Sequence, residues 1–233
     1  MFTDRARLVN VEDGIQVHGD GLGDPPRALP RGRHSLGRDV VAASQRDRLL
    51  EAMAAVVNDK GYPATTVADV VERAGVSRKT FYEHFADKLD CFLATYDLAA
   101  ELLLAAMAEA ADCDGSGWRE RTVMSVRAYL SILSEGAFAR ASFLEVPAAG
   151  DAALARRSEV HDRFVTLFRR IHTEARRDDP SIPARKPVMF RAAVGAVNEL
   201  VTEAVRTGDA ARLPRLEPAV VEILTALLGP ARS

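Results

Sequence analysis

Apolar residues recur along most of this chain every three or four positions, which is the spacing of one helix face. The stretches with this pattern are about 39–60 (or 44–60), 66–74, 78–85, 88–111, 118–133, 137–146, 152–177, 187–207 and 218–228. Runs of β-branched residues bounded by turn residues are scarce, so strands are not expected. The pattern therefore predicts an all-α protein of about nine helices.

Residues 1–38 lack this period and carry many glycines and prolines, so a disordered N-terminal arm is expected. The end of the arm is basic, with Arg27, Arg31, Arg33, His34 and Arg38 just ahead of the first helix. Two roles remain open for these residues. They could lie along DNA phosphates or enter a minor groove, or they could form a solvated tail.

The stretch 65–88 reads as two short helices joined by a tight turn. Gly75 ends the first helix, because glycine adopts a positive φ at little cost. Ser77 is a favourable N-cap for the second helix, since its hydroxyl can accept a bond from a free backbone N–H. Phe81 and Phe85, four positions apart, turn inward and leave cations, hydroxyls and Tyr82 to point elsewhere. This layout is typical of a helix-turn-helix DNA-binding motif.

Several short motifs in this region resemble the DNA-binding domain of TetR-type (tetracycline-repressor-like) transcriptional regulators. They are Gly-x-x-x-Thr-Thr-Val at 61–67, Ala-Gly-Val-Ser at 74–77, and Thr-Phe-Tyr-x-His-Phe at 80–85 followed by Lys88. The resemblance covers about residues 44–104, and the alternative is a generic helical hairpin. It implies a three-helix DNA-binding domain at 39–90, with the motif at about 66–85, and a helical effector-binding and dimerisation domain at 91–233.

The second helix of the motif begins with Arg78 and Lys79, which are placed to reach base edges. Both favour guanine O6 and N7, so G-containing half-sites are expected. Thr66, at the start of the first helix, offers a hydroxyl and an N–H to a phosphate. The resemblance implies that Tyr82 contacts a base or a phosphate and that Thr80, His84 and Lys88 contact phosphates. The alternative for Tyr82 is a half-buried core ring, and the alternative for His84 is a surface histidine. The candidate DNA-binding residues are Thr66, Ser77, Arg78, Lys79, Thr80, Tyr82, His84 and Lys88.

The resemblance also implies an effector cavity among the helices that follow the motif. Candidate lining residues are Leu103, Met107, Met124, Tyr129, Phe143, Phe164 and Phe168, although each could equally be plain core. Walls of methionine and phenylalanine suit a small apolar or aromatic effector. Binding would tilt the helix at 88–111, which carries the DNA-binding motif, and so change operator affinity.

The last two helices, at about 187–207 and 218–228, are apolar over a wide arc. Small residues at Ala193, Gly195 and Ala196 permit close approach of another helix. The resemblance implies a homodimer that pairs these helices around a two-fold axis; the alternative is burial within one chain. A dimer would hold two recognition helices about 34–36 Å apart and would require a near-palindromic double-stranded operator.

Charge and hydropathy set limits on location and partners. The formal net charge is −2, but residues 27–90 hold eleven bases and nine acids, so DNA attraction must come from placement. No apolar run reaches the roughly 18 residues of a membrane span. The N-terminus is polar and charged, unlike a signal peptide. We expect a cytoplasmic protein that does not enter a membrane.

The chain offers little for catalysis or metal binding. His161 and His172 lie near one face of a helix but about 16 Å apart along it, so they cannot share a metal. No HExxH, CxxC, GxSxG or phosphate-binding glycine loop is present. We expect neither catalytic residues nor a cofactor. Cys91 and Cys113, expected on one helix, are read as buried apolar residues, with redox sensing as the alternative.

The function that unites these features is sequence-specific binding of DNA by a transcriptional regulator. A ligand-responsive repressor is expected, because a dimer on a promoter blocks polymerase. The alternative is a helical protein-interaction module that no longer binds DNA.

Overall fold

The computed structural model describes residues 38–112, 117–135, 138–208 and 210–229, and for 38–41 and 210 the backbone alone. These residues belong to one compact unit, Gly37–Ser233. Of the predicted N-terminal arm, only Arg38 falls among them, as the first residue of a helix; Arg27, Arg31, Arg33 and His34 lie outside the described residues.

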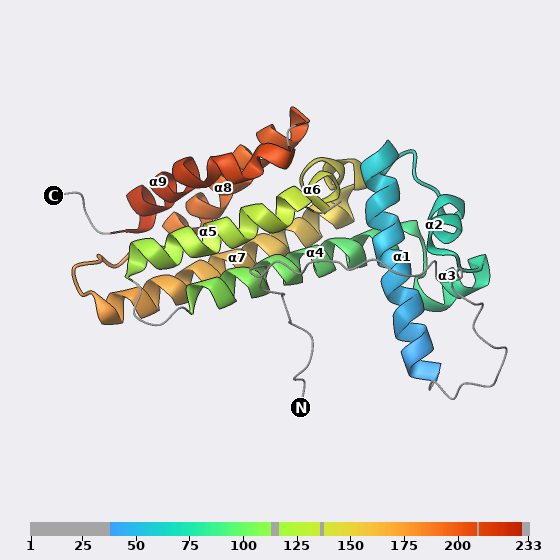
Figure 1. Ribbon diagram of the computed structural model, residues 1–233, viewed down its shortest axis with the longest axis horizontal. Helices are drawn as coiled ribbons and strands as arrows, with labels where there is room; N and C mark the ends of the chain where they lie inside the picture. The colour runs from blue at the N-terminus through green and yellow to red at the C-terminus, as the bar shows by residue number, and fades with distance from the viewer. Residues whose placement is uncertain (1–37, 113–116, 136–137, 209, 230–233) are drawn as a thin grey trace, which may run out of the picture. The chain divides into compact units, whose positions relative to one another are not determined.

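All described secondary structure is helical, which confirms the predicted fold class (Figure 1). The helices are α1 (Arg38–Lys60), α2 (Val67–Ala74), α3 (Arg78–His84), α4 (Lys88–Ala111), α5 (Trp118–Glu135), α6 (Phe138–Arg140), α7 (Asp151–Asp178), α8 (Pro187–Arg206) and α9 (Glu217–Leu228). Three short turns complete the described chain: the π-helical η1 (Ala141–Glu145) and the 3-10 turns η2 (Pro147–Ala149) and η3 (Ala210–Leu216).

The predicted helix at 137–146 is the element that differs most from expectation. After one turn of α6 the chain widens into the π-helical η1, and Pro147 then begins a 3-10 turn. Proline cannot donate the backbone hydrogen bond that would continue a helix, so the segment stops there. Single π-helical turns are frequent at functional sites, and η1 lies between the two cores described next.

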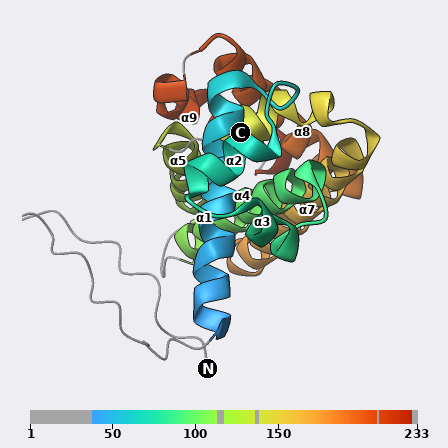
Figure 2. The same ribbon diagram turned by 90° about the vertical axis from the view of Figure 1, so that its right-hand side faces the viewer.

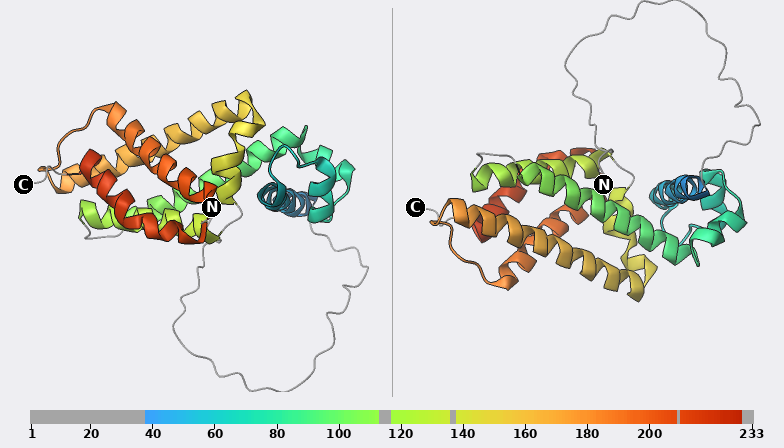
Figure 3. Two further views of the ribbon diagram at one scale, coloured as in Figure 1. Left: turned by 90° about the horizontal axis from the view of Figure 1, so that it is seen from above. Right: turned by 90° about the horizontal axis from the view of Figure 1, so that it is seen from below.

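Two hydrophobic cores organise the fold, and α4 belongs to both. The first core joins α1, α2, α3 and the N-terminal half of α4, where Phe81 and Phe92 are fully buried. The second joins the C-terminal half of α4 to α5, α7, α8 and α9. Figure 2 shows α1, α2 and α3 grouped together, and both views of Figure 3 show α4 leading from that group into the other helices. A movement of α4 would therefore change the packing of both cores.

By length and composition alone, α4 is long and apolar enough to cross a membrane. The prediction that no run in the sequence is long enough to do so did not identify this helix. Its buried residues run from Cys91 to Ala111 and pack into both cores, as expected for a core helix. Burial raises the pKa of the Cys91 thiol to about 12 and so disfavours the reactive thiolate. The helix ends at Ala111, so Cys113 does not share it and lies outside the described residues.

Candidate DNA interface and effector cavity

The start of α2 is fixed by a capping box between Thr66 and Asp69. The Thr66 N–H donates to Asp69 Oδ2 over 2.7 Å, and the Asp69 N–H donates to Thr66 Oγ1 over 3.3 Å. Lys60 lies 2.6 Å from the same carboxylate. Its hydrogen bond, followed by those from the Thr66 hydroxyl and N–H, lowers the pKa of Asp69 to about 2. The hydroxyl and N–H that were predicted to bind a phosphate are thus engaged by a carboxylate, which a phosphate would have to displace.

The turn between α2 and α3 is built by Gly75, whose φ of 63° lies in the left-handed region. Its N–H donates to the Glu72 carbonyl, and the Val76 N–H donates to the Val71 carbonyl, a C-cap that closes the end of α2. Ser77 then caps α3, accepting a 3.0 Å bond from the Thr80 N–H. Local chemistry alone therefore sets the direction in which α3 leaves the turn.

Helix α3 buries one face and exposes a basic and aromatic one. Phe81 is fully buried, and its ring centroid lies 5.7 Å from that of Phe85. On the outer face the Arg78 guanidinium lies 5.9 Å from the centroid of the Tyr82 ring, which is 49% exposed. Tyr82 is therefore not a core ring. Lys79 is exposed beside these residues, with its ammonium 3.8 Å from Glu83 Oε1.

The other candidates on α3 are less available. Thr80 and His84 are half-buried, and the hydroxyls of Ser77 and Thr80 share a 2.9 Å hydrogen bond. The structure thus brings Arg78, Lys79 and Tyr82 together on one open surface, which we call the reading face. Thr66 and Ser77 are also exposed, but their side chains serve as the N-caps of α2 and α3.

Lys88 has a different role from the phosphate contact that the resemblance implied. Its ammonium donates to the carbonyls of Tyr62 and Thr65 over 3.0 and 2.9 Å and lies 4.1 Å from the centroid of the Tyr62 ring. These contacts tie the start of α4 to the α1–α2 turn. The geometry supports a structural role and gives no support to phosphate binding.

Replacing Lys88 by methionine tests this assignment. The variant keeps the apolar stem but removes two charge-assisted hydrogen bonds, so we expect it to lose about 1.5–3 kcal/mol of unfolding free energy. The salt dependence of DNA binding should keep its slope, whereas loss of one phosphate contact would reduce the slope by about 0.9. Urea denaturation and a salt series measure the two effects. Lys186→Met, at an exposed lysine before α8, is the matched control.

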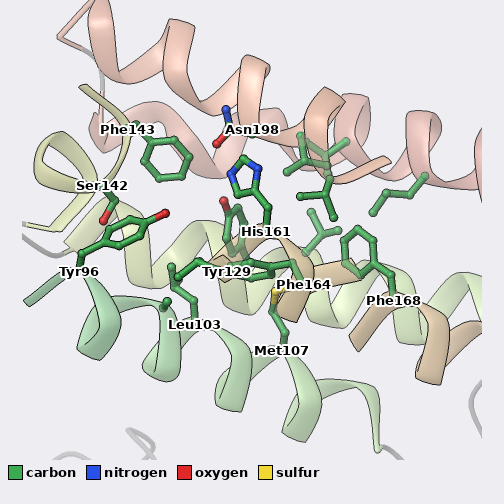
Figure 4. Close-up of a pocket in the computed structure, with 17 residues that line it drawn as sticks. Tyr96, Leu103, Met107, Tyr129, Ser142, Phe143, His161, Phe164, Phe168 and Asn198 are labelled. Atoms are coloured by element: carbon green, nitrogen blue, oxygen red, sulfur yellow. The ribbon is translucent and has the colours of Figure 1, made fainter. Parts of the chain in front are cut away.

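A cavity of about 50 Å³ lies between α4, α5, η1, α7, α8 and α9 (Figure 4). Six of the predicted effector residues line it: Leu103, Met107, Tyr129, Phe143, Phe164 and Phe168. Met124 does not, because it lies two positions before the lining residue Val126 and therefore about 200° around α5 from it. Ligand sites of drug-sized molecules hold about 300–1,000 Å³, so an effector would need the walls to separate.

Sequence reasoning missed the polar part of the lining and the contribution of the last two helices. The additional residues are Tyr96, Ala100, Val126, Ser142, Val160, His161, Val194, Val197, Asn198, Val220 and Leu224. His161 was recognisable in principle, since it precedes Phe164 and Phe168 by three and seven positions on α7 and so shares their face. Its imidazole hydrogen-bonds the side chain of Asn198 on α8.

A single carboxylate joins the cavity wall to the DNA-binding end. Glu145 in η1 is buried; its Oε2 accepts a 2.9 Å bond from the Tyr62 N–H, and its Oε1 accepts a 3.0 Å bond from Arg140 Nε. The carboxylate also packs on Gly61, where an added Cβ would lie 3.1 Å from Oε2. Ser142 and Phe143, three and two residues earlier in the same turn, line the cavity. One short turn therefore touches both regions.

The outer faces of α8 and α9 carry small side chains. The apolar arc of α8 that includes Ala193 is buried within the chain, so Ala193 is not available to a partner as predicted. Ala192 and Gly195 are exposed on the opposite face, and Val188 is 62% exposed. On α9, Ala219 and Ala226 are exposed. Burial within one chain thus accounts for much of the apolar pattern, and a narrow small-residue surface remains.

Helices α2 and α3 form a capped helix-turn-helix motif with an exposed basic face, and one long helix, α4, joins this motif to the helices that surround the cavity. Residues 49–95 match the model of the family described as bacterial regulatory proteins, tetR family. This match runs from Leu49 in α1 through α2 and α3 into the first turns of α4, so it covers the DNA-binding end of the chain.

Two curated relatives match over the DNA-binding end, both from Mycolicibacterium smegmatis. The HTH-type transcriptional activator FasR is 32% identical over 81 residues, which is 35% of this chain and 37% of FasR. The HTH-type transcriptional repressor KstR2 is 44% identical over 46 residues, 20% of this chain and 22% of KstR2. The chain thus spans little more than a third of the length of FasR and about a fifth of that of KstR2.

Solved structures share the fold over most of the chain. FadR from Bacillus subtilis, in complex with stearoyl-CoA, superposes with a TM-score of 0.69 at 19% identity, covering 80% of this chain and 99% of that one. FadR from Bacillus halodurans, a fatty acid degradation regulator, gives 0.71 at 19% identity, covering 81% and 96%. At this identity the likeness shows the fold.

Proposed function

We propose that the protein is a cytoplasmic, sequence-specific DNA-binding transcriptional regulator that responds to a small apolar or aromatic effector. The observation that carries the proposal is the reading face: Arg78, Lys79 and Tyr82 are exposed on a short helix whose opposite side is anchored by Phe81. Anchoring orders the backbone before DNA arrives, and the exposed cations are those that bind guanine edges in a major groove.

The active form is a homodimer that pairs α8 and α9 with their two-fold copies. The small exposed residues on these helices support this assembly, because they let two helix pairs approach closely. An added Cβ at Gly195 would meet nothing within 4 Å in the single chain, so this position is open to a partner. A dimer of this kind presents two reading faces to a near-palindromic operator.

Repression is the proposed direction of control, because a dimer bound at a promoter obstructs polymerase. The curated relatives include one activator and one repressor, so the direction rests on this steric reason. An effector acts by separating the walls of the cavity. That movement shifts η1 and α4, and with them the Glu145 contact to Tyr62 and the spacing of the two reading faces.

Selection from a pool of random duplexes with the purified protein tests the proposal. We expect convergence on a near-palindrome with guanine in each half-site, bound saturably by two chains per duplex. Binding that is blind to sequence and merely weakens with salt would overturn the proposal. The helical protein-interaction module would then be the better description.

A further inference from the structure

The cavity has two chemically distinct ends, as Figure 4 shows. Met107 and Phe168 lie toward one end, with aliphatic residues of α8 and α9 completing an apolar wall. Tyr96 and Ser142 lie toward the other end together with Phe143 and Leu103, and His161 lies between the two ends. An occupant that satisfies both ends must itself be amphiphilic, with a polar head and an apolar tail.

The polar end holds hydroxyl groups that the described part of the chain does not satisfy. Tyr96 and Tyr129 are both more than nine-tenths buried. Neither phenol, nor the Ser142 hydroxyl, has a hydrogen-bond partner among the described residues. Buried polar groups in proteins are nearly always paired. Three hydroxyls facing one cavity therefore point to a ligand group that accepts several hydrogen bonds.

An unpaired cation, Arg157, lies one turn from the lining residue His161, although it is not itself part of the cavity lining. Arg157 precedes His161 by one turn of α7 and so shares its face. It is half-buried and has no ion pair among the residues described, while its neighbours Arg156 and Arg191 are paired with Asp97 and Asp162. Its charge acts on both Tyr96 and His161.

The two carboxylates whose charges act at this end, Asp97 and Asp162, are each paired with an arginine other than Arg157. Burial raises the pKa of Tyr96 to about 12, so the phenol stays protonated despite Arg157. Burial, and then Arg157, lower the pKa of His161, while its bond to Asn198 acts in the opposite direction. Near pH 7 the polar end thus offers hydroxyl donors, a neutral imidazole and one positive charge.

We propose that the effector is an amphiphile with a single carboxylate head, which Arg157 binds together with Tyr96 and His161 while the tail extends toward Phe168. The seven residues from His161 to Phe168 span roughly 10 Å of helix, which suits a medium-length alkyl tail. The carboxylate supplies the missing acceptors and the missing negative charge at once. This inference rests on the proposed effector role of the cavity and names the chemical class of its ligand.

Calorimetric titration of the full chain without DNA tests the inference, with decanoate, decan-1-ol and methyl decanoate as probes. We expect decanoate to bind at least 10-fold more tightly than the two neutral probes. Arg157→Gln should weaken decanoate at least 10-fold and leave the neutral probes within about 2-fold. Tyr96→Phe, which removes only a hydroxyl, should weaken decanoate by a smaller factor. Arg169→Gln, at an exposed arginine on the same helix, is the matched control.

Three outcomes would overturn the inference: no binding of decanoate, equal binding of all three probes, or a decanoate affinity that Arg157→Gln leaves unchanged. Circular dichroism of each variant checks that the helices persist. Because no DNA is present, failure here leaves the DNA-binding proposal intact. Conversely, a chain that binds decanoate but selects no operator would retain the cavity assignment and lose the proposed regulatory function.

Discussion

Replacing Arg78 and Lys79 together by alanine is expected to remove sequence-specific DNA binding while leaving the fold in place. Each base contact of a well-placed arginine or lysine contributes about 1–3 kcal/mol of discrimination. Loss of two contacts should weaken operator binding roughly 30-fold to 10,000-fold. Both side chains are exposed, and their contacts with Tyr82 and Glu83 are surface interactions, so unfolding free energy should change by less than about 1 kcal/mol.

Fluorescence anisotropy with the selected operator and with a scrambled duplex measures the loss of specificity. The matched control is Arg169→Ala with Arg170→Ala, which removes the same charge from two exposed positions on α7. If both double variants weaken binding equally, the effect is general electrostatic attraction and not base recognition. If neither changes binding, α3 is not the recognition helix and the reading face needs another partner.

Features set by neighbouring residues were predictable from the sequence. Thr66 and Ser77 were each expected to begin a helix, and each accepts a bond from a backbone N–H three residues later. Gly75 was expected to end α2 and does so with a positive φ. Caps and turns depend on residues within a few positions of one another, so the information is local.

Features set by the packing of distant helices were not predictable in this way. The apolar residues of the cavity on α4, α5 and α7 follow from the period of each helix, because the period identifies the inward face. The pairing of His161 with Asn198 depends instead on how α7 meets α8. No periodicity within either helix records that contact, and so the polar end of the cavity was missed.

Lys88 shows that a family resemblance can identify the residue type at a position without predicting where its side chain points. The resemblance implied a phosphate contact, whereas the ammonium meets the carbonyls of Tyr62 and Thr65, which lie 26 and 23 residues away in the chain. Glu145 illustrates the same limit, since its partner Tyr62 is 83 residues away. Both side chains contact the turn between α1 and α2. The sequence did not predict that this turn binds distant residues.

Replacing Glu145 by glutamine is expected to uncouple the cavity from the DNA-binding end. The carboxylate accepts bonds from two donors, Tyr62 N–H and Arg140 Nε. Glutamine has one acceptor oxygen and turns its NH₂ group toward one of those donors. A buried donor left unpaired costs about 1–3 kcal/mol, and we expect that loss of unfolding free energy. The Tyr62 amide should also exchange its hydrogen faster, because it is the group released.

The effect on DNA binding follows from the position of this contact. With the α1–α2 turn less firmly held by η1, the effector-free protein should bind its operator roughly 5- to 150-fold more weakly, the range of typical coupling energies of 1–3 kcal/mol. Hydrogen exchange, urea denaturation and operator titration measure the three effects. Glu109→Gln, the same change at an exposed position on α4, should alter none of them. An unchanged exchange rate at Tyr62 together with unchanged operator affinity would exclude Glu145 as the link, and α4 alone would then have to carry the signal between the two cores.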